Sequence, residues 1–332
     1  MLLVITYHYI REIQTGKGIY PITPSNFAKQ LDLLGEHFRF ISLPELIDMK
    51  NNRPALTISE NLCLITFDDG LREQYETAWP ILKKKGIPAV FFVSTQPLLD
   101  GQLLRVHKIH YVRSIIKHSV IEDSLSAVFK TEYNEIMGNI DPGLIAKIYR
   151  YDSESEAYLK YLLNFVLSEN DVDKFIEYLY EKYVKLKDDT RALYLTENQI
   201  IELSKHDAIG SHTVSHRPLG KLDLKEAVFE LSESKKTLEN LTDKRIMAVG
   251  YPYGGSAAVT REVAEIAEKS GYEVGFTTER SFNNSLLDPL LLARADTNDA
   301  IGGKSPQFDF VGGKLTITGN FNLTRSRWES EK

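Results

Sequence analysis

The sequence predicts an α/β fold in which a parallel sheet, covered by helices, curls into a closed or nearly closed barrel. Short apolar runs alternate with amphipathic segments over most of the 332 residues, and the runs are apolar almost throughout. Such runs are typical of strands that are buried on both faces, and about seven strand–helix units suffice for a barrel. The predicted strands are Leu2–Thr6, Leu62–Phe67, Ala89–Val93, Ala208–Gly210, Met247–Gly250, Val274–Thr277 and Leu290–Leu292.

The segments between these strands have the apolar periodicity of amphipathic helices. The basic run Lys83–Lys85 ends one of them, where positive charge complements the helix dipole. A shorter helix is expected from Leu43, and the tail Lys314–Arg325 is expected to form a hairpin around Gly319-Asn320. The longer predicted helices are Pro24–His37, Leu71–Lys85, Leu222–Leu241 and Val259–Ser270.

The alternation of strands and helices stops at about Pro97 and resumes at about Leu195. Within this stretch, Tyr158–Leu167 and Val172–Lys187 have helical periodicity, and Asn170-Asp171 is a candidate cap for the second helix. Few strand signals occur here. We therefore expect residues 97–195 to be a helical insertion that follows the strand Ala89–Val93, within a single barrel domain that comprises residues 1–332.

The composition argues against several classes of protein. The formal net charge is -6 and no dense Lys/Arg tract occurs, so a nucleic-acid partner is not expected. The single cysteine, Cys63, excludes an intramolecular disulfide and is expected to be a buried, inert thiol. The start, Met1–Tyr7, has neither a basic region nor a cleavage site, and its apolar stretch is too short to span a membrane. A cytoplasmic protein is therefore expected, with peripheral membrane contact through a lipid-anchored substrate left open.

Polar motifs follow three of the predicted strands. Asp68-Asp69 comes directly after one strand, His212 and His216 come after another, and the loop 250–255 follows a third. Each has an ordinary explanation by itself: a polar turn, a coincidental histidine pair and a strand-to-helix loop. Because the carboxyl ends of parallel strands share one face of a barrel, we expect the three motifs to converge there.

The residue types in these motifs suit metal-assisted hydrolysis. One carboxylate and two histidines leave coordination positions open, as a catalytic metal site requires. The second carboxylate can then act as a base, and a loop rich in backbone N–H groups can stabilise an oxyanion. No Glu follows His212, so the pair does not belong to the zinc-protease helix.

These motifs resemble those of the polysaccharide deacetylases (carbohydrate esterase family four, the NodB-homology domain). The resemblance lies in Thr66–Gly70, in the spacing of His212 and His216, and in the Pro-Tyr-Gly loop at 252–254. It covers roughly residues 1–95 and 195–299, with the insertion outside it. The resemblance implies a distorted (β/α)7 barrel, one divalent metal ion that is usually zinc, and a carbohydrate substrate.

Carried over by resemblance, each motif residue receives a role. Asp68 would be the general base, and the backbone N–H of Tyr253 would help to stabilise the oxyanion. Asp69, His212 and His216 would ligate the metal.

The chain departs from the family pattern at two positions. Gly250 stands where the family usually has an Arg, two residues before the Pro of the third motif, and no histidine follows His216 to supply the general acid. His8, at the end of the first strand, lies where permuted members of the family place their acid. Arg294, after the last strand, could pair with Asp68 and keep it ionised, although an ordinary arginine at the edge of the core remains the alternative.

The expected function is that of a metal-dependent deacetylase that hydrolyses the N-acetyl amide of an amino sugar in a glycan or glycan precursor, for cell-surface polysaccharide biosynthesis. One alternative is a deformylase or other amidase that acts on a lipid-linked amino sugar. Another is a non-catalytic glycan-binding protein. His107 and His110 have a spacing that could bind a metal, but a structural or substrate-contacting role is favoured for them.

Overall fold

A computed structural model describes residues 1–13, 19–52, 60–130, 135, 140–149, 152–184 and 190–323. The chain divides into two compact units. The first contains Met1–Glu12, Pro21–Gln102 and Arg191–Lys332, and the second contains Ile13–Tyr20 and Leu103–Thr190. The predicted insertion, residues 97–195, contains the long segment of the second unit. That the whole chain is a single domain stays a prediction.

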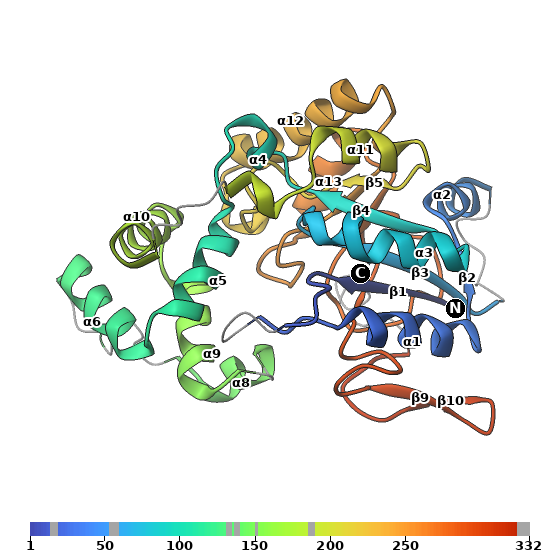
Figure 1. Ribbon diagram of the computed structural model, residues 1–332, viewed down its shortest axis with the longest axis horizontal. Helices are drawn as coiled ribbons and strands as arrows, with labels where there is room; N and C mark the ends of the chain where they lie inside the picture. Colours follow the sequence, from blue (N-terminus) through green and yellow to red (C-terminus); the bar gives the residue numbers. More distant parts are fainter. Residues whose placement is uncertain are drawn as a thin grey trace. The chain divides into compact units, whose positions relative to one another are not determined.

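The first unit is built on a parallel sheet with the order β7-β6-β5-β4-β3-β1-β8, and β2 pairs with β3 beside this path. A bridge between Phe276 and Leu292 joins β7 to the chain just before β8, so the two edges of the curved sheet meet. Helices surround the sheet (Figure 1), and the predicted α/β barrel class is confirmed. The strands are β1 (Leu2–Tyr7), β2 (Arg39–Phe40), β3 (Leu62–Phe67), β4 (Ala89–Val93), β5 (Ile209–Ser211), β6 (Ala248–Gly250), β7 (Val274–Phe276) and β8 (Ala295–Asp296).

The long strands are buried on both faces, as their continuous apolar sequences predict. Every residue of β1, β3 and β4 is buried. Cys63 lies inside β3, where burial raises the pKa of its thiol, which confirms a buried cysteine. The last predicted strand, Leu290–Leu292, is wrong: Pro289–Leu291 form a 3-10 turn. Proline has no N–H to donate to a strand ladder, and the strand begins later, at Ala295.

Helices cover the sheet of the first unit close to where their periodicity predicted them. The predicted helix 71–85 differs, because a π-helix over Gln74–Ala78 interrupts it before the α-helix Trp79–Lys85. Pro80 has no backbone N–H to donate to a carbonyl of the preceding turn, which accounts for the widened turn before it. The helices are α1 (Pro24–Gly35), α2 (Leu43–Asn52), α3 (Trp79–Lys85), α4 (Gln96–Leu99), α11 (Glu197–Ser204), α12 (Leu224–Thr242) and α13 (Arg261–Lys269), with 3-10 turns at Thr190–Leu193 and Leu219–Lys221.

The described residues of the second unit form helices with a core of their own. The predicted cap of the helix α10 is wrong: Ser168 caps it, and its hydroxyl accepts a hydrogen bond from the backbone N–H of Asp171. Residues 185–187, predicted to continue this helix, lie outside the described residues. The helices are α5 (Arg105–Ile115), α6 (His118–Phe129), α8 (Pro142–Ile148), α9 (Glu154–Tyr161) and α10 (Glu169–Leu179), with π-helical turns at Leu162–Val166 and Tyr180–Val184.

The tail contains the predicted hairpin, but the turn lies elsewhere. Strands β9 (Phe308–Val311) and β10 (Lys314–Ile317) pair antiparallel around Gly312-Gly313, not around Gly319-Asn320. Gly312 and Gly313 have φ values of 59° and 76°, which two-residue hairpin turns require and glycine adopts without steric cost. Across the part of the chain that the structure describes, no helix is both long and apolar enough to cross a bilayer.

The barrel interior is packed so closely around Phe92 that its neighbours must be glycines. A Cβ atom on Gly210 would lie 2.4 Å from the Phe92 ring, and one on Gly250 would lie 2.8 Å from it. These glycines are in β5 and β6, next to the ends that carry two of the motifs. The ring thus occupies the space that side chains on β5 and β6 would need.

We expect Gly210→Ala to lower the free energy of unfolding by about 1–3 kcal/mol, because overpacking forces Phe92 or a strand to shift. Gly255→Ala is the control, since its added Cβ would meet no atom closer than 3.9 Å. Denaturant unfolding of both variants measures the difference. Equal stabilities would contradict the packing argument.

Candidate functional site

The carboxyl ends of the parallel strands bring the sequence motifs to one edge of the barrel. His8 follows β1, Asp68 and Asp69 follow β3, and His212 lies just beyond β5. Tyr253 comes after β6. Since parallel strands end on the same side of a barrel, these residues meet although up to 245 positions separate them in the sequence.

Asp69, His212 and His216 form a compact, buried group of metal-ligating side chains. The Asp69 Oδ1 atom lies 3.5 Å from His212 Nε2 and 3.3 Å from His216 Nε2. One ligand atom from each residue lies within 4.8 Å of the others. His107 and His110, with rings 5.9 Å apart in α5, belong to no such group among the described residues.

The geometry of this group fits a divalent ion such as zinc. Zinc binds nitrogen and carboxylate oxygen at about 2.0–2.2 Å, so tetrahedral ligand atoms lie about 3.3–3.5 Å apart. Both separations from Asp69 Oδ1 agree with that spacing. His212 Nδ1 lies 2.6 Å from the carbonyl oxygen of Gly250 and donates a hydrogen bond to it. In the neutral imidazole, Nε2 then has the free lone pair that can bind a metal ion.

The loop that carries both histidines has an unusual backbone that Glu230 holds in place. Thr213 and His216 have φ values of 63° and 60°, a region that β-branched and bulky residues avoid. The Glu230 carboxylate, buried on α12, accepts hydrogen bonds from the backbone N–H groups of Val214 and Ser215, both at 2.9 Å. It also accepts from the Ser215 hydroxyl. Glu230 therefore fixes the loop between the two histidines.

Asp68 is held in a bidentate ion pair with Arg294. The two guanidinium nitrogens Nη1 and Nη2 donate to Asp68 Oδ1 and Oδ2 at 2.7 and 2.8 Å, and Arg294 Nε donates to the carbonyl oxygen of Thr277. Burial has the largest single effect and raises the pKa of Asp68, but the charges of Arg294, His212 and His8, with the hydrogen bonds from Arg294, together outweigh burial and lower the pKa to about 2. Asp68 is thus an ionised carboxylate beside the metal-ligating group.

His8 and Tyr253 border the same site. His8 Nε2 lies 3.9 Å from Asp68 Oδ2, and its side chain is 40% exposed. The Tyr253 ring packs edge-on against the His216 ring, with centroids 5.2 Å apart, which places the Tyr253 side chain next to the metal-ligating group. Asp296 accepts from the backbone N–H of Asn298 at 2.8 Å. Burial raises the pKa of Asp296, while a charged His8 nearby would lower it.

Two residues that support the site were not predicted from the sequence. Gln74 donates to the carbonyl oxygens of Asp68 and His8, at 2.6 and 3.1 Å, and so ties the ends of β1 and β3 together. Glu230 could have been found, because it lies on the apolar face of α12 between Ala227 and Leu231, where a charged residue needs buried partners. Gln74 is uncharged, and its sequence context did not mark it as a residue that supports the site.

The polysaccharide deacetylase family model matches residues 56–125 and 151–275, more than half of the chain. The chain therefore belongs to the polysaccharide deacetylase family. Members of this family are hydrolases that act on carbon–nitrogen bonds other than peptide bonds.

Individual relatives agree with this assignment. YxkH of Bacillus subtilis (strain 168), a protein named after the same family, is 36% identical over 87 residues, which are 26% of this chain and 30% of that protein. The match thus spans less than a third of YxkH. The chain is also similar to the Streptococcus pyogenes deacetylase PplD in complex with acetate (TM-score 0.54, 20% identity, 89% of this chain and 91% of that one). IcaB from Ammonifex degensii gives a TM-score of 0.51 at 20% identity, covering 89% of this chain and 90% of that one. At such identities the two structures show a shared fold.

We expect Arg294→Met to lower the free energy of unfolding by about 3–5 kcal/mol at pH 7, because it leaves Asp68 buried and unpaired. In the wild type, the pKa of Asp68 is about 2 against an ordinary 3.8, so its stabilising contribution is complete above pH 3.8 and is lost as the pH falls towards 2. In the variant burial dominates and the pKa of Asp68 rises, so acidification should recover part of the lost stability. Chemical unfolding at a series of pH values tests this, and parallel pH profiles for both proteins would contradict it.

We expect Glu230→Gln to weaken zinc binding by roughly 10–100-fold, as for other residues that orient metal ligands. Glutamine has one amide oxygen. It cannot replace both carboxylate oxygens of Glu230, of which one accepts the two backbone N–H groups and the other accepts the Ser215 hydroxyl. The matched control is Glu239→Gln on the same helix, since Glu239 also accepts a backbone N–H, that of Ile246, but lies away from the histidine loop. Competition with a zinc-binding dye measures the dissociation constants, and equal values for the two variants would show that Glu230 does not position the loop.

Proposed function

We propose that this protein is a metal-dependent deacetylase that hydrolyses the N-acetyl amide of an amino sugar in a glycan or glycan precursor. The observation that carries the proposal is an ionised carboxylate, Asp68, held by Arg294 beside the buried group Asp69, His212 and His216. A base next to a metal site with three protein ligands is the arrangement that metal-assisted hydrolysis needs. Membership of the polysaccharide deacetylase family supports an amide on a carbohydrate as the bond that is cleaved.

Asp69, His212 and His216 would hold the ion, and two nitrogens with one carboxylate oxygen favour zinc. A bound divalent ion supplies a water that is acidic near neutral pH and a polarised carbonyl. Asp68 would accept the proton of that water as its oxygen attacks the amide carbon. Its carboxylate is ready for this role, because a pKa of about 2 keeps it deprotonated at neutral pH.

The other residues of the site would act on the oxyanion and on the leaving nitrogen. The backbone N–H of Tyr253 would donate to the tetrahedral oxyanion, and the loss of one such donor costs about 3–4 kcal/mol in comparable sites. An amine leaves only when it is protonated, and His8 would give it that proton as the carbon–nitrogen bond breaks. His8 is suited to this role because it lies near Asp68 and is partly open to solvent.

A deformylase with the same chemistry is a second candidate, since the site residues do not distinguish a formyl from an acetyl group. A glycan-binding protein without activity is less well supported, because the base and all three ligand side chains are in place. A role in cell-surface polysaccharide biosynthesis and a cytoplasmic location stay predictions from the sequence.

We expect the wild type to bind about one zinc-like ion per chain and to release acetate from N-acetylated sugars. Asp68→Asn should keep the metal but lose at least roughly a hundredfold in kcat, because it removes the base. His212→Ala should lose both the metal and the activity. Elemental analysis measures the metal content, and an acetate assay measures the activity. A formate assay distinguishes a deformylase from a deacetylase.

Two results would contradict the proposal. Full activity in Asp68→Asn would exclude Asp68 as the base. No metal in the wild type after reconstitution with zinc would mean that the three ligand side chains do not act together, and the glycan-binding alternative would then be favoured.

A further inference from the structure

The side chain of His8, the proposed general acid, has a loose contact with the base. Its Nε2 atom lies 3.9 Å from Asp68 Oδ2, which is longer than a hydrogen bond, and the side chain is 40% exposed. A proton donor has to lie within hydrogen-bond reach of the nitrogen that it protonates. The place of the His8 imidazole therefore depends strongly on how the backbone around residue 8 is held.

The segment that carries His8 leads out of the first unit. Ile13–Tyr20 belong to the second unit, and the chain then returns to the first. The outgoing and returning segments are bonded to each other, since the N–H of Ile22 donates to the carbonyl oxygen of Tyr9 and that of Arg11 donates to Ile22, both at 3.1 Å. These bonds join the two segments, but they do not tie them to the chain that carries the base.

Glu73 makes that connection, because it lies on the chain that follows β3. Its Oε1 atom accepts a hydrogen bond from the backbone N–H of Ile10 at 2.6 Å, and its Oε2 atom lies 2.5 Å from Arg11 Nη2. The guanidinium of Arg11 lies 4.6 Å from the centre of the Tyr9 ring. One carboxylate thus holds the backbone two residues after His8 and the side chain of the residue that follows.

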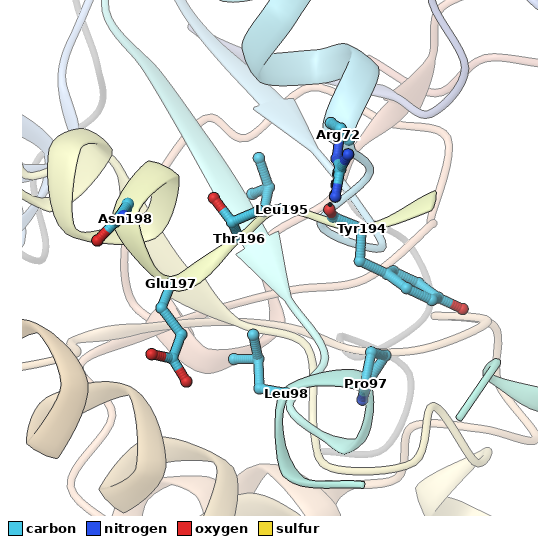
Figure 2. A pocket seen from close by; sticks show the side chains of 8 residues that line it. All are labelled: Arg72, Pro97, Leu98, Tyr194, Leu195, Thr196, Glu197 and Asn198. Carbon is cyan, nitrogen blue, oxygen red and sulfur yellow. Dashed lines mark hydrogen bonds between the residues drawn. The ribbon is translucent and has the colours of Figure 1, made fainter. Parts of the chain in front are cut away.

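Glu73 itself lies on a firmly held segment. On one side of it, Arg72 Nε donates to the carbonyl oxygen of Tyr194 at 3.3 Å (Figure 2). On the other side, Gln74 Nε2 donates to the carbonyl oxygen of Asp68 at 2.6 Å. Gln74 also begins a π-helix, a rare element that occurs mostly at functional sites. Glu73 is therefore a suitable anchor for a neighbouring segment.

We propose that Glu73 is a positioning residue for the general acid: it holds the His8 segment so that the imidazole reaches the leaving nitrogen. This inference rests on the proposed function. When the carbon–nitrogen bond breaks, its electron pair stays on the nitrogen, which takes a proton from His8 and leaves as the amine. A displacement of about 1 Å is enough to slow such a step roughly a hundredfold.

The alternative is that Glu73 and Arg11 form an ordinary surface ion pair, which contributes little. Two observations favour the positioning role. The side chains are mostly buried, with exposed fractions of 19% for Glu73 and 24% for Arg11. The carboxylate also accepts from a backbone N–H, that of Ile10, and so acts on the path of the chain and not only on another side chain.

The leaving group of the substrate separates the two alternatives. An amide needs the acid, because an amine leaves only when it is protonated, whereas the nitrophenolate of 4-nitrophenyl acetate leaves without a proton. The zinc-loaded protein is assayed with this ester, with N-acetylglucosamine and with its β-1,4- and β-1,6-linked dimers. We expect Glu73→Ala to lower the ratio of amide kcat to ester kcat by roughly 10–100-fold.

Three further variants test whether Glu73 acts through His8. Glu73→Gln should restore most of the ratio, because its amide oxygen can still accept from the N–H of Ile10. Glu73→Ala combined with His8→Ala should lower the ratio no further than His8→Ala alone, since the group to be positioned is gone. Glu76→Ala is the control and should keep the wild-type ratio, because Glu76 is an exposed acid in the π-helix that follows.

Three results would overturn the inference and leave the deacetylase standing. Equal losses on amide and ester in Glu73→Ala, or a further loss of the ratio in the His8→Ala background, would mean that Glu73 is a structural residue. A wild-type ratio in Glu73→Ala would mean that its contact with Arg11 is an ordinary ion pair.

Failure of the proposed function gives a different result. The zinc-loaded wild type would then release no acetate from any of the N-acetylated sugars, whether or not it cleaves the ester. That result would reject the deacetylase and, with it, the positioning role of Glu73.

Discussion

The site depends on one buried ion pair. Asp68 follows β3 and Arg294 lies just before β8, and their two parallel hydrogen bonds join segments 226 positions apart. A buried carboxylate without a partner would be protonated or would destabilise the fold. Arg294 avoids both outcomes, and its remaining contacts to Thr277, Thr6 and Thr66 satisfy its own donors inside the barrel. The same pair therefore links distant segments inside the barrel and keeps the Asp68 carboxylate ionised.

Arg294 and Gly250 both lie against the Phe92 ring. The resemblance implies an arginine at the position of Gly250, but here the Phe92 ring fills the space in which a side chain at 250 would begin. The guanidinium of Arg294 lies over the same ring, 5.6 Å from its centre. Gly250 on β6 thus leaves room for the Phe92 ring of β4, and the arginine that pairs with Asp68 comes from the chain just before β8. The resemblance alone would have left Asp68 without its partner.

The histidine loop shows how a strained local backbone is maintained. Left-handed conformations at Thr213 and His216 are unfavourable by themselves, and local sequence does not impose them. Glu230 binds the two backbone N–H groups between them, and Ser94 donates to the carbonyl oxygen of His212. The loop is therefore held from α12 on one side and from the end of β4 on the other. Such support holds the histidine nitrogens in place, and it would lower the cost of binding an ion there.

The sequence by itself determined the barrel class, six of its strands and the residues that meet at their ends. Continuous apolar runs identify buried parallel strands, and polar motifs at their carboxyl ends must converge because parallel strands end together. Local patterns failed where backbone chemistry or long-range packing decided the outcome: at Pro289, which replaced a strand by a turn, and at Gly312-Gly313, which moved the hairpin. Only the tertiary structure showed that Glu230 and Gln74 hold the motif loops. Those contacts join residues far apart in sequence, and which of many polar side chains meet is decided by how the elements pack.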